Sequence, residues 1–513
     1  MKLRNIKSSF QSCLLCAVGL GSLGSTSLHA VDGIPVWTNF YNGPGSTNDL
    51  AYAVAVDSSG NIIVTGQSQS TSSSSSYDYA TIKYSGAGVA LWTNRYNGPG
   101  NNLDRAAALS VDGNNNVFVT GQSEGSGATL AYSSSGVPLW TNRCNFSPDS
   151  MAVDNGGNVF VTGRSSGNYV TIAYSGGGPV LWTNYHDGGS FSISSPPALA
   201  VDGIGNVFVT GYSASSSGFG TEDYLTIKYS GAGMPVWTNR YNGPGNYTDI
   251  CAAVAVDGTG NVFVTGQSSS SSSPFSLDYA TIAYSGAGIP LWTNRYNGPA
   301  NAMDFANAVT VDGNGNVFVT GLAAPFSSSG DFATIAYSGA GVPLWTNRYN
   351  GPGDTSDQGN AIVTDSSGNV IVTGSASGGA TTIAYTSAGL PLWTNQVAGM
   401  NSAPSKQSCA IAANGVVIAG WTVASPDYEV VKYAPVFPTG YNQIAARFLT
   451  GGDLSLSFVG NSGTYYALDR TLGLLPPVWT PQETNLTSIS GLLIFTNTPI
   501  PSTNNFWRIR SVP

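Results

Sequence analysis

Three sequence blocks recur in a fixed order along most of this chain, and this repetition constrains the fold more than any other feature. One block reads AVAVDSSGNIIVTG at 53–66, and a second reads DYATIKY at 78–84. The third is the tripeptide Trp-Thr-Asn, which begins at Trp37, Trp92, Trp140, Trp182, Trp237, Trp292, Trp345 and Trp393. A period of roughly 40 to 55 residues is typical of arrays in which each unit packs against its neighbours. We therefore expect one repeat array.

Constant spacings within the repeat predict where the chain turns tightly. In seven copies the Asp and Gly of the first block are nine positions apart, as in Asp57 and Gly66. The Tyr that ends the second block lies eight positions before the next Trp, as in Tyr84 and Trp92. Fixed intervals of this length predict tight hairpins, whereas the variable interval between the two blocks predicts a surface loop. Each repeat therefore offers four strands.

Four strands per unit predict a propeller blade, because a single four-stranded sheet cannot bury both of its faces. We predict an all-β fold: a closed β-propeller of about eight four-stranded blades over 31–436, with seven blades as the alternative. Small residues such as Ala53 and Ala55 place the first strand near the crowded axis, and the Trp strand then lies at the outer edge. Since the Trp37 strand precedes any inner strand, 35–41 is predicted to complete the blade begun by 410–433.

The recurring blocks resemble the bacterial β-propeller repeats known as SBBP repeats. The resemblance rests on DYATIKY, PLWTNRYNGPG and AVAVDxxGNVFVTG in fixed order, and it spans roughly 31–436. It implies a propeller fold and an extracellular or envelope location, but no particular reaction. Two units depart from the pattern: the one around 144–154 is shortened, and the last reads AIAANGVVIAG. Cys144 replaces the Tyr found at Tyr96 and is interpreted as a packing substitution.

The two ends of the chain differ from the repeat array. Residues 1–30 carry Lys2, Arg4 and Lys7, then an apolar stretch, then small residues ending at Ala30, which is typical of a cleaved secretory signal peptide. We therefore expect a protein that is secreted or held at the cell envelope or outer surface, with no membrane span after cleavage. Residues 437–513 predict a small C-terminal β-sandwich domain, similar to those on large exported proteins of verrucomicrobia-type bacteria.

The charge pattern argues against two classes of partner. The formal net charge is −9, and only 9% of the residues are charged. Nucleic acids and anionic lipid surfaces are bound by clustered Lys and Arg side chains, which this chain lacks. We expect no nucleic-acid partner.

Five aspartates are the candidate ligand-binding residues. Each lies eight positions before the turn Asp of its repeat, where the chain is expected to enter the innermost strand. In a closed ring they would surround one mouth of the central channel and could bind a divalent cation such as calcium, or a cationic ligand. The alternative is that each caps its own crossover loop. The five are Asp49, Asp104, Asp249, Asp304 and Asp357.

The recurring turn Asp-x-x-Gly-Asn resembles the start of a calcium loop, but its interpretation as an ordinary hairpin turn is favoured. No Glu closes a twelve-residue loop, so we expect hairpin turns in which Asp accepts backbone hydrogen bonds and Gly takes a positive φ. The regularly placed tryptophans are likewise expected to pack between blades and not to bind sugars. The turn aspartates are Asp57, Asp112, Asp154, Asp202, Asp257, Asp312 and Asp365.

Catalysis finds little support in the sequence. Beyond the signal peptide the chain has one histidine, His186, and four glutamates, none of which occupies a repeated position. Triads and zinc sites need histidines that are absent, so we expect no catalytic residue and no cofactor other than the calcium considered above. The predicted function is an exported, non-enzymatic scaffold for binding or adhesion to polysaccharide or protein. The alternative is a carbohydrate-active hydrolase or lyase using the channel-mouth aspartates.

Overall fold

The computed structural model describes most of the repeat region and the strands that follow it. The described residues are 16–17, then 35–433 without 46–47, 72–75, 189–196, 215–219, 274–275, 300, 325–329, 354–355, 403–406, 413–414 and 425, then 444–448, 454–459, 465–472, 479–486, 492–497 and 506–512. All regular structure in these residues is β. Apart from 16–17, the predicted signal peptide lies outside the described residues.

Seven blades are four-stranded antiparallel sheets whose strand order follows the sequence. In each blade the first and second strands join through the Asp-x-x-Gly-Asn turn, and the third and fourth through the turn before the Trp strand. The strands are β3(Asp49–Val56), β4(Ile62–Gln69), β5(Tyr77–Tyr84), β6(Ala90–Tyr96); β7(Asp104–Val111), β8(Val117–Ser123), β9(Ser126–Tyr132), β10(Pro138–Cys144); β11(Ser147–Val153), β12(Val159–Ser165), β13(Asn168–Tyr174), β14(Val180–Asp187); β15(Ala198–Val201), β16(Val207–Ala214), β17(Glu222–Tyr229), β18(Pro235–Tyr241); β19(Asp249–Val256), β20(Val262–Ser269), β21(Leu277–Tyr284), β22(Pro290–Tyr296); β23(Asp304–Val311), β24(Val317–Ala323), β25(Asp331–Tyr337), β26(Pro343–Tyr349); β27(Gln358–Thr364), β28(Val370–Ala376), β29(Gly379–Tyr385), β30(Pro391–Ala398).

The eighth blade joins the two ends of the array, as the strand order predicted. Its outer strand is β2(Pro35–Tyr41), which pairs antiparallel with β34(Tyr428–Tyr433) from Pro35–Tyr433 to Tyr41–Tyr428. β34 pairs in turn with β33(Gly415–Thr422). The inner edge departs from the other blades, because two short strands, β31(Met400–Ser402) and β32(Cys409–Ala412), pair with β33 in place of one.

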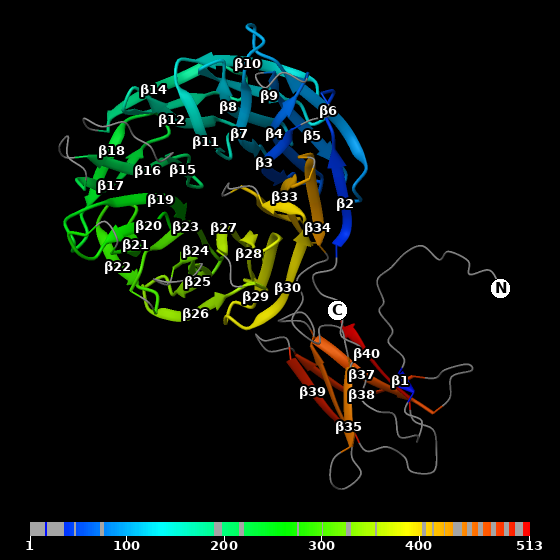
Figure 1. The fold of residues 1–513 in the computed structure, drawn as a ribbon. Helices are drawn as coiled ribbons and strands as arrows, with labels where there is room; N and C mark the ends of the chain where they lie inside the picture. The colour runs from blue at the N-terminus through cyan, green and yellow to red at the C-terminus, as the bar shows by residue number, and fades with distance from the viewer. Residues whose placement is uncertain are drawn as a thin grey trace. The chain divides into compact units, whose positions relative to one another are not determined.

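The inner strands of neighbouring blades contact one another around the ring, from β3 and β7 through β23 and β27, and β32 contacts both β27 and β3. Figure 1 shows the blades arranged in this closed circle. The small residues of these strands allow the close approach: Ala51, Ala53, Ala106 and Ala361 have no exposed surface. The protein is thus an eight-bladed β-propeller, and the seven-bladed alternative is excluded.

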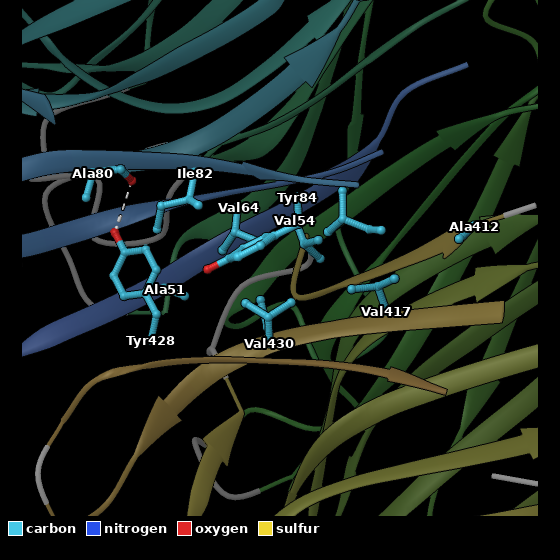
Figure 2. Packing of buried hydrophobic residues seen from close by; sticks show 12 residues of the cluster. Ala51, Val54, Val64, Ala80, Ile82, Tyr84, Ala412, Val417, Tyr428 and Val430 are labelled. Atoms are coloured by element: carbon cyan, nitrogen blue, oxygen red, sulfur yellow. Dashed lines mark hydrogen bonds between the residues drawn. The ribbon is translucent and has the colours of Figure 1, made fainter. Parts of the chain in front are cut away.

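The hydrophobic core is divided into clusters that each span two neighbouring blades. At the point of closure, Val54 and Val64 of blade 1 pack with Val417 and Val430 of blade 8. Figure 2 shows this cluster, in which the Tyr428 hydroxyl donates a 3.1 Å hydrogen bond to the Ala80 carbonyl. Each blade therefore buries its faces only when both neighbours are present.

The remaining strands belong to a second compact unit of 437–513 with 1–32, whereas the propeller unit is 33–436. One sheet contains β1(Cys16–Ala17), β40(Phe506–Val512), β37(Tyr465–Thr471) and β38(Thr480–Leu486), and the other contains β35(Ile444–Phe448), β36(Leu454–Val459) and β39(Leu492–Asn497). Leu456, Leu468, Phe495 and Ile509 form one buried cluster from both sheets. Among the described residues, no helix is long and apolar enough to cross a membrane.

Deleting residues 31–45 should abolish the cooperative thermal transition of the propeller. The deletion removes β2, leaves β34 as a bare edge and uncovers the side of blade 1 on which Trp37 packs. Differential scanning calorimetry of the truncated and parent proteins measures the effect. Phe40→Ala is the matched control, because Phe40 lies in the same strand with 59% of its surface exposed and should leave the transition unchanged. A truncated protein that melts like its parent contradicts the closure.

Candidate functional site

The Trp-Thr-Asn tripeptide ties each outer strand to the next blade. The Trp140 indole N–H donates a 2.9 Å hydrogen bond to the Gly176 carbonyl, and the Asn142 amide donates one of 2.6 Å to the Gly178 carbonyl. We call this pair of contacts the Trp–Asn staple. Gly178 has a φ of 106° and lies against the indole, so a Cβ there would approach the ring to 3.0 Å. The staple recurs for Trp37/Asn39, Trp92/Asn94, Trp140/Asn142, Trp182/Asn184, Trp237/Asn239, Trp292/Asn294 and Trp345/Asn347.

These contacts support the packing role of the tryptophans. Each stapled indole is half-buried against a Tyr of the next blade, as in Trp140 and Tyr174 with ring centroids 5.7 Å apart. The polar N–H is satisfied by a neighbouring carbonyl. A sugar-stacking role at these positions is therefore not supported.

A second contact, the Arg–Tyr bridge, links outer strands farther from the turn. The Arg three positions after Trp donates to the hydroxyl of the Tyr four positions after Trp in the preceding blade. The Arg95 guanidinium lies 3.0 Å from the Tyr41 hydroxyl, and that of Arg295 lies 3.4 Å from Tyr241. Arg95 is also held by Asp78 of its own blade at 2.8 Å. The bridge thus covers the groove between neighbouring outer strands.

The boundary between blades 2 and 3 lacks both halves of this bridge. In blade 2 Cys144 replaces the Tyr of the bridge, and in blade 3 Tyr185 replaces the Arg. The crossover is also short, because β10 ends at Cys144 and β11 begins at Ser147. The result is an open groove of about 470 Å³, which is lined by Ser126, Asn142, Arg143, Cys144, Asn145, Ile172, Tyr174, Val180, Thr183 and Tyr185.

Other boundaries also depart from the bridge. Between blades 6 and 7, Gln396 replaces the Arg, and between blades 7 and 8, Val397 and Phe40 replace the Tyr and Arg; Val397 packs against a buried cluster that contains Met400 and Trp393. Between blades 3 and 4, His186 takes the Tyr position next to Arg240, and burial lowers the pKa of its imidazole.

The groove between blades 2 and 3 combines an aromatic ring with neutral polar groups. Tyr185 has 62% of its surface exposed, and Asn145 and Thr183 are also exposed. Arg143 is paired with Glu124 at 3.0 Å, so the guanidinium charge is compensated. Burial raises the pKa of the Cys144 thiol to about 11, which keeps it protonated and weakly nucleophilic at neutral pH.

The five channel-mouth aspartates lie where the chain enters the inner strand of its blade, and each is fully buried in its crossover loop. Asp49 accepts backbone hydrogen bonds from Gly43 at 2.6 Å and Gln69 at 3.1 Å. In the other four, the donor glycine is again six positions earlier. A ligand could reach these carboxylates only after the crossover loops had opened. The glycine–aspartate pairs are Gly43/Asp49, Gly98/Asp104, Gly243/Asp249, Gly298/Asp304 and Gly351/Asp357.

These contacts are those of the loop-capping alternative. Within the described part of the chain, no three His, Cys, Asp or Glu side chains are grouped to hold a metal ion. Calcium binding and ligand contact at the five aspartates stay predictions.

The hairpin interpretation of the Asp-x-x-Gly-Asn turns is confirmed by their geometry. In the first turn the Asp57 carboxylate accepts a 2.8 Å hydrogen bond from the Asn61 backbone, and Gly60 has a φ of 78°. The same backbone bond forms in the turns of Asp57, Asp112, Asp154, Asp202, Asp257, Asp312 and Asp365.

Comparisons with known proteins agree with this architecture. A family model described as "SBBP: Beta-propeller repeat" matches residues 236–272, which include β20. This chain carries an SBBP β-propeller repeat. No curated protein matches this chain.

The solved structures to which this chain is similar share little sequence with it. A protein from Lactobacillus plantarum is 13% identical, with 69% of this chain and 97% of that chain covered and a TM-score of 0.41. Virginiamycin B lyase from Staphylococcus aureus is 9% identical, covering 66% and 95%, with a TM-score of 0.35. The propeller domain of the trilobed protease from Pyrococcus furiosus is 8% identical, covering 75% and 96%, with a TM-score of 0.38.

Tyr185 is not among the residues that the sequence pattern singles out. Its importance depends on which strands face each other, since it lies one repeat after Cys144. The available signal was a pair of departures in consecutive Trp-Thr-Asn-Arg-Tyr segments, RC at 143–144 and YH at 185–186, next to the shortened crossover.

Ala323→Ser should stabilise the protein near pH 7. Burial raises the pKa of Asp304 to about 6, and Ala323 opposite it cannot donate the hydrogen bond that Ser68 gives Asp49. An Asp whose pKa is raised in the folded state favours folding at low pH, and that contribution is lost as pH rises through about 6. The new hydroxyl should favour the carboxylate and stabilise by about 0.5–1.5 kcal/mol.

Melting temperatures near pH 5 and near pH 7 measure this effect. Asp304→Asn is the matched control, because it removes the titrating group and should reduce the difference between the two pH values. The prediction is contradicted if Ala323→Ser does not raise the melting temperature near pH 7.

Proposed function

We propose that this protein is an exported, non-enzymatic scaffold that binds polysaccharide or protein at the cell envelope or outside the cell. The ligand contacts the groove between blades 2 and 3. One observation carries the proposal: both partners of the Arg–Tyr bridge are replaced at this boundary, and the residues that the structure describes leave an open groove there.

An open groove between two blades costs the protein the contacts that would otherwise join them. Between blades 8 and 1, blades 1 and 2, and blades 4 and 5, the same space is occupied by a guanidinium, a phenol and a longer crossover, which contribute packing and hydrogen bonds. A local departure that gives up such contacts without compensation is typical of a functional site. A volume of about 470 Å³ also lies within the ~300–1,000 Å³ range of small-ligand sites.

The alternative function, a hydrolase or lyase, needs two carboxyl groups beside a bound sugar. The five candidate aspartates are buried and occupied by backbone donors. The site contacts therefore favour binding over hydrolysis at these positions.

The double substitution Cys144→Tyr with Tyr185→Arg should close the groove and abolish binding. It restores the residues that form the bridge between blades 8 and 1, blades 1 and 2, and blades 4 and 5, and it adds packing between β10 and β14, so we also expect a higher melting temperature. The probe is a suspension of cell envelopes from the producing bacterium, and binding of the full chain is measured by co-sedimentation. Periodate treatment of the envelopes removes polysaccharide ligands, and protease treatment removes protein ligands.

His186→Tyr is the matched control for this experiment. It restores the Tyr position next to Arg240 at the neighbouring boundary without touching the groove. We expect unchanged envelope binding. If the double variant binds envelopes as well as the parent, the groove is not the ligand site.

A further inference from the structure

We infer that the ligand of the groove between blades 2 and 3 is an uncharged polysaccharide segment that stacks on Tyr185. This inference rests on the proposed function and names its ligand chemistry. Three features of the groove carry it: an exposed ring, polar side chains without internal partners, and a compensated charge.

The exposed ring is that of Tyr185, on the face of β14 that lines the groove. Blades 1, 2, 4, 5 and 6 place an Arg at this strand position, and in blades 1, 2 and 5 its guanidinium contacts a Tyr hydroxyl of the preceding blade. Among the residues that the structure describes, Tyr185 has no such partner, and 62% of its surface is exposed. An aromatic side chain offers an apolar face and a polar tip, which matches the C–H face and hydroxyl rim of a sugar ring.

The polar lining is suited to hydroxyl groups. Within the described part of the chain, the side chains of Ser126, Asn145 and Thr183 make no hydrogen bond. Hydroxyl and amide groups both donate and accept hydrogen bonds. Sugar hydroxyls have the same double capacity, so each of these side chains can pair with one.

The charge of the lining favours an uncharged ligand. Arg143 is the charged residue of the lining, and its guanidinium contacts Glu124 at 3.0 Å, Tyr96 at 3.1 Å and Ser123 at 3.1 Å. Recognition of a carboxylate or sulfate ester would need a cation free to form charge-assisted hydrogen bonds. A folded protein partner would need about 800 Å² of surface, which exceeds what this groove presents.

Calorimetric titration of the full chain with defined polymers tests the inference. The neutral probes are dextran, amylose, laminarin and galactomannan, and the anionic probes are alginate and polygalacturonate. We expect at least one neutral polymer to bind, with an affinity that changes little with salt because no ion pair forms. Tyr185→Ala should weaken that binding by about tenfold or more, whereas Tyr185→Phe should retain it.

Phe40→Ala is the matched control, because Phe40 occupies the same strand position in blade 8 with 59% exposure and is not part of the groove between blades 2 and 3. It should leave binding unchanged, and thermal melting should show that every variant is folded. Binding restricted to the anionic polymers, or to none of the six, overturns the inference. So does neutral-polymer binding that survives Tyr185→Ala.

The failure of this inference can be told apart from failure of the proposed function. If none of the neutral polymers binds, but closing the groove still abolishes envelope binding, the site stands and only its ligand chemistry is wrong. If closing the groove leaves envelope binding intact, the proposed site itself fails.

Discussion

The structure depends on the burial of each blade between two neighbours. A four-stranded sheet has two apolar faces, and the core clusters here are shared across blade boundaries, as between Val54 and Val430. Apolar burial alone is not directional. The Trp–Asn staple aligns each outer strand with the next blade, because its two donors bind two carbonyls of that blade's turn. A turn glycine with positive φ, such as Gly178, is needed for the backbone to pass beneath the indole.

Most of the ring could be predicted from the sequence because each blade makes the same local demands. Constant spacings predicted the hairpins, and the position of Trp37 before any inner strand predicted that β2 closes the ring by pairing with β34. The inner edge of blade 8 could not be predicted in this way. There the Gln407 carbonyl accepts from the Val54 backbone at 2.8 Å, and its side chain accepts from the Leu109 backbone at 3.1 Å. Such contacts join three blades and occur in no other repeat of the described chain.

The position of the channel-mouth aspartates was predicted from the sequence, but that position did not decide between ligand binding and loop capping. Their placement at the start of the inner strand followed from the spacing, but their burial depends on how each crossover folds back. The fixed interval of six residues between Gly43 and Asp49, repeated between Gly298 and Asp304, was the signal for a capped loop. A glycine donor at a fixed interval before the aspartate indicates a structural contact within the loop. A ring of ligand-binding aspartates would require only that each lies at the same place around the central channel.

The groove between blades 2 and 3 is marked by residues that differ from the repeat, whereas the hairpins and the capped loops are marked by residues that recur in it. Loss of the Tyr alone, at Cys144, would leave an arginine opposite it without its usual acceptor. Instead Tyr185 has replaced that arginine one repeat later, so both sides of a single boundary have changed together. A similar pair of changes occurs between blades 7 and 8, where Val397 packs against a buried cluster that contains Met400. Between blades 2 and 3 the described residues instead leave an open groove beside Tyr185, and the proposed external ligand accounts for that open space.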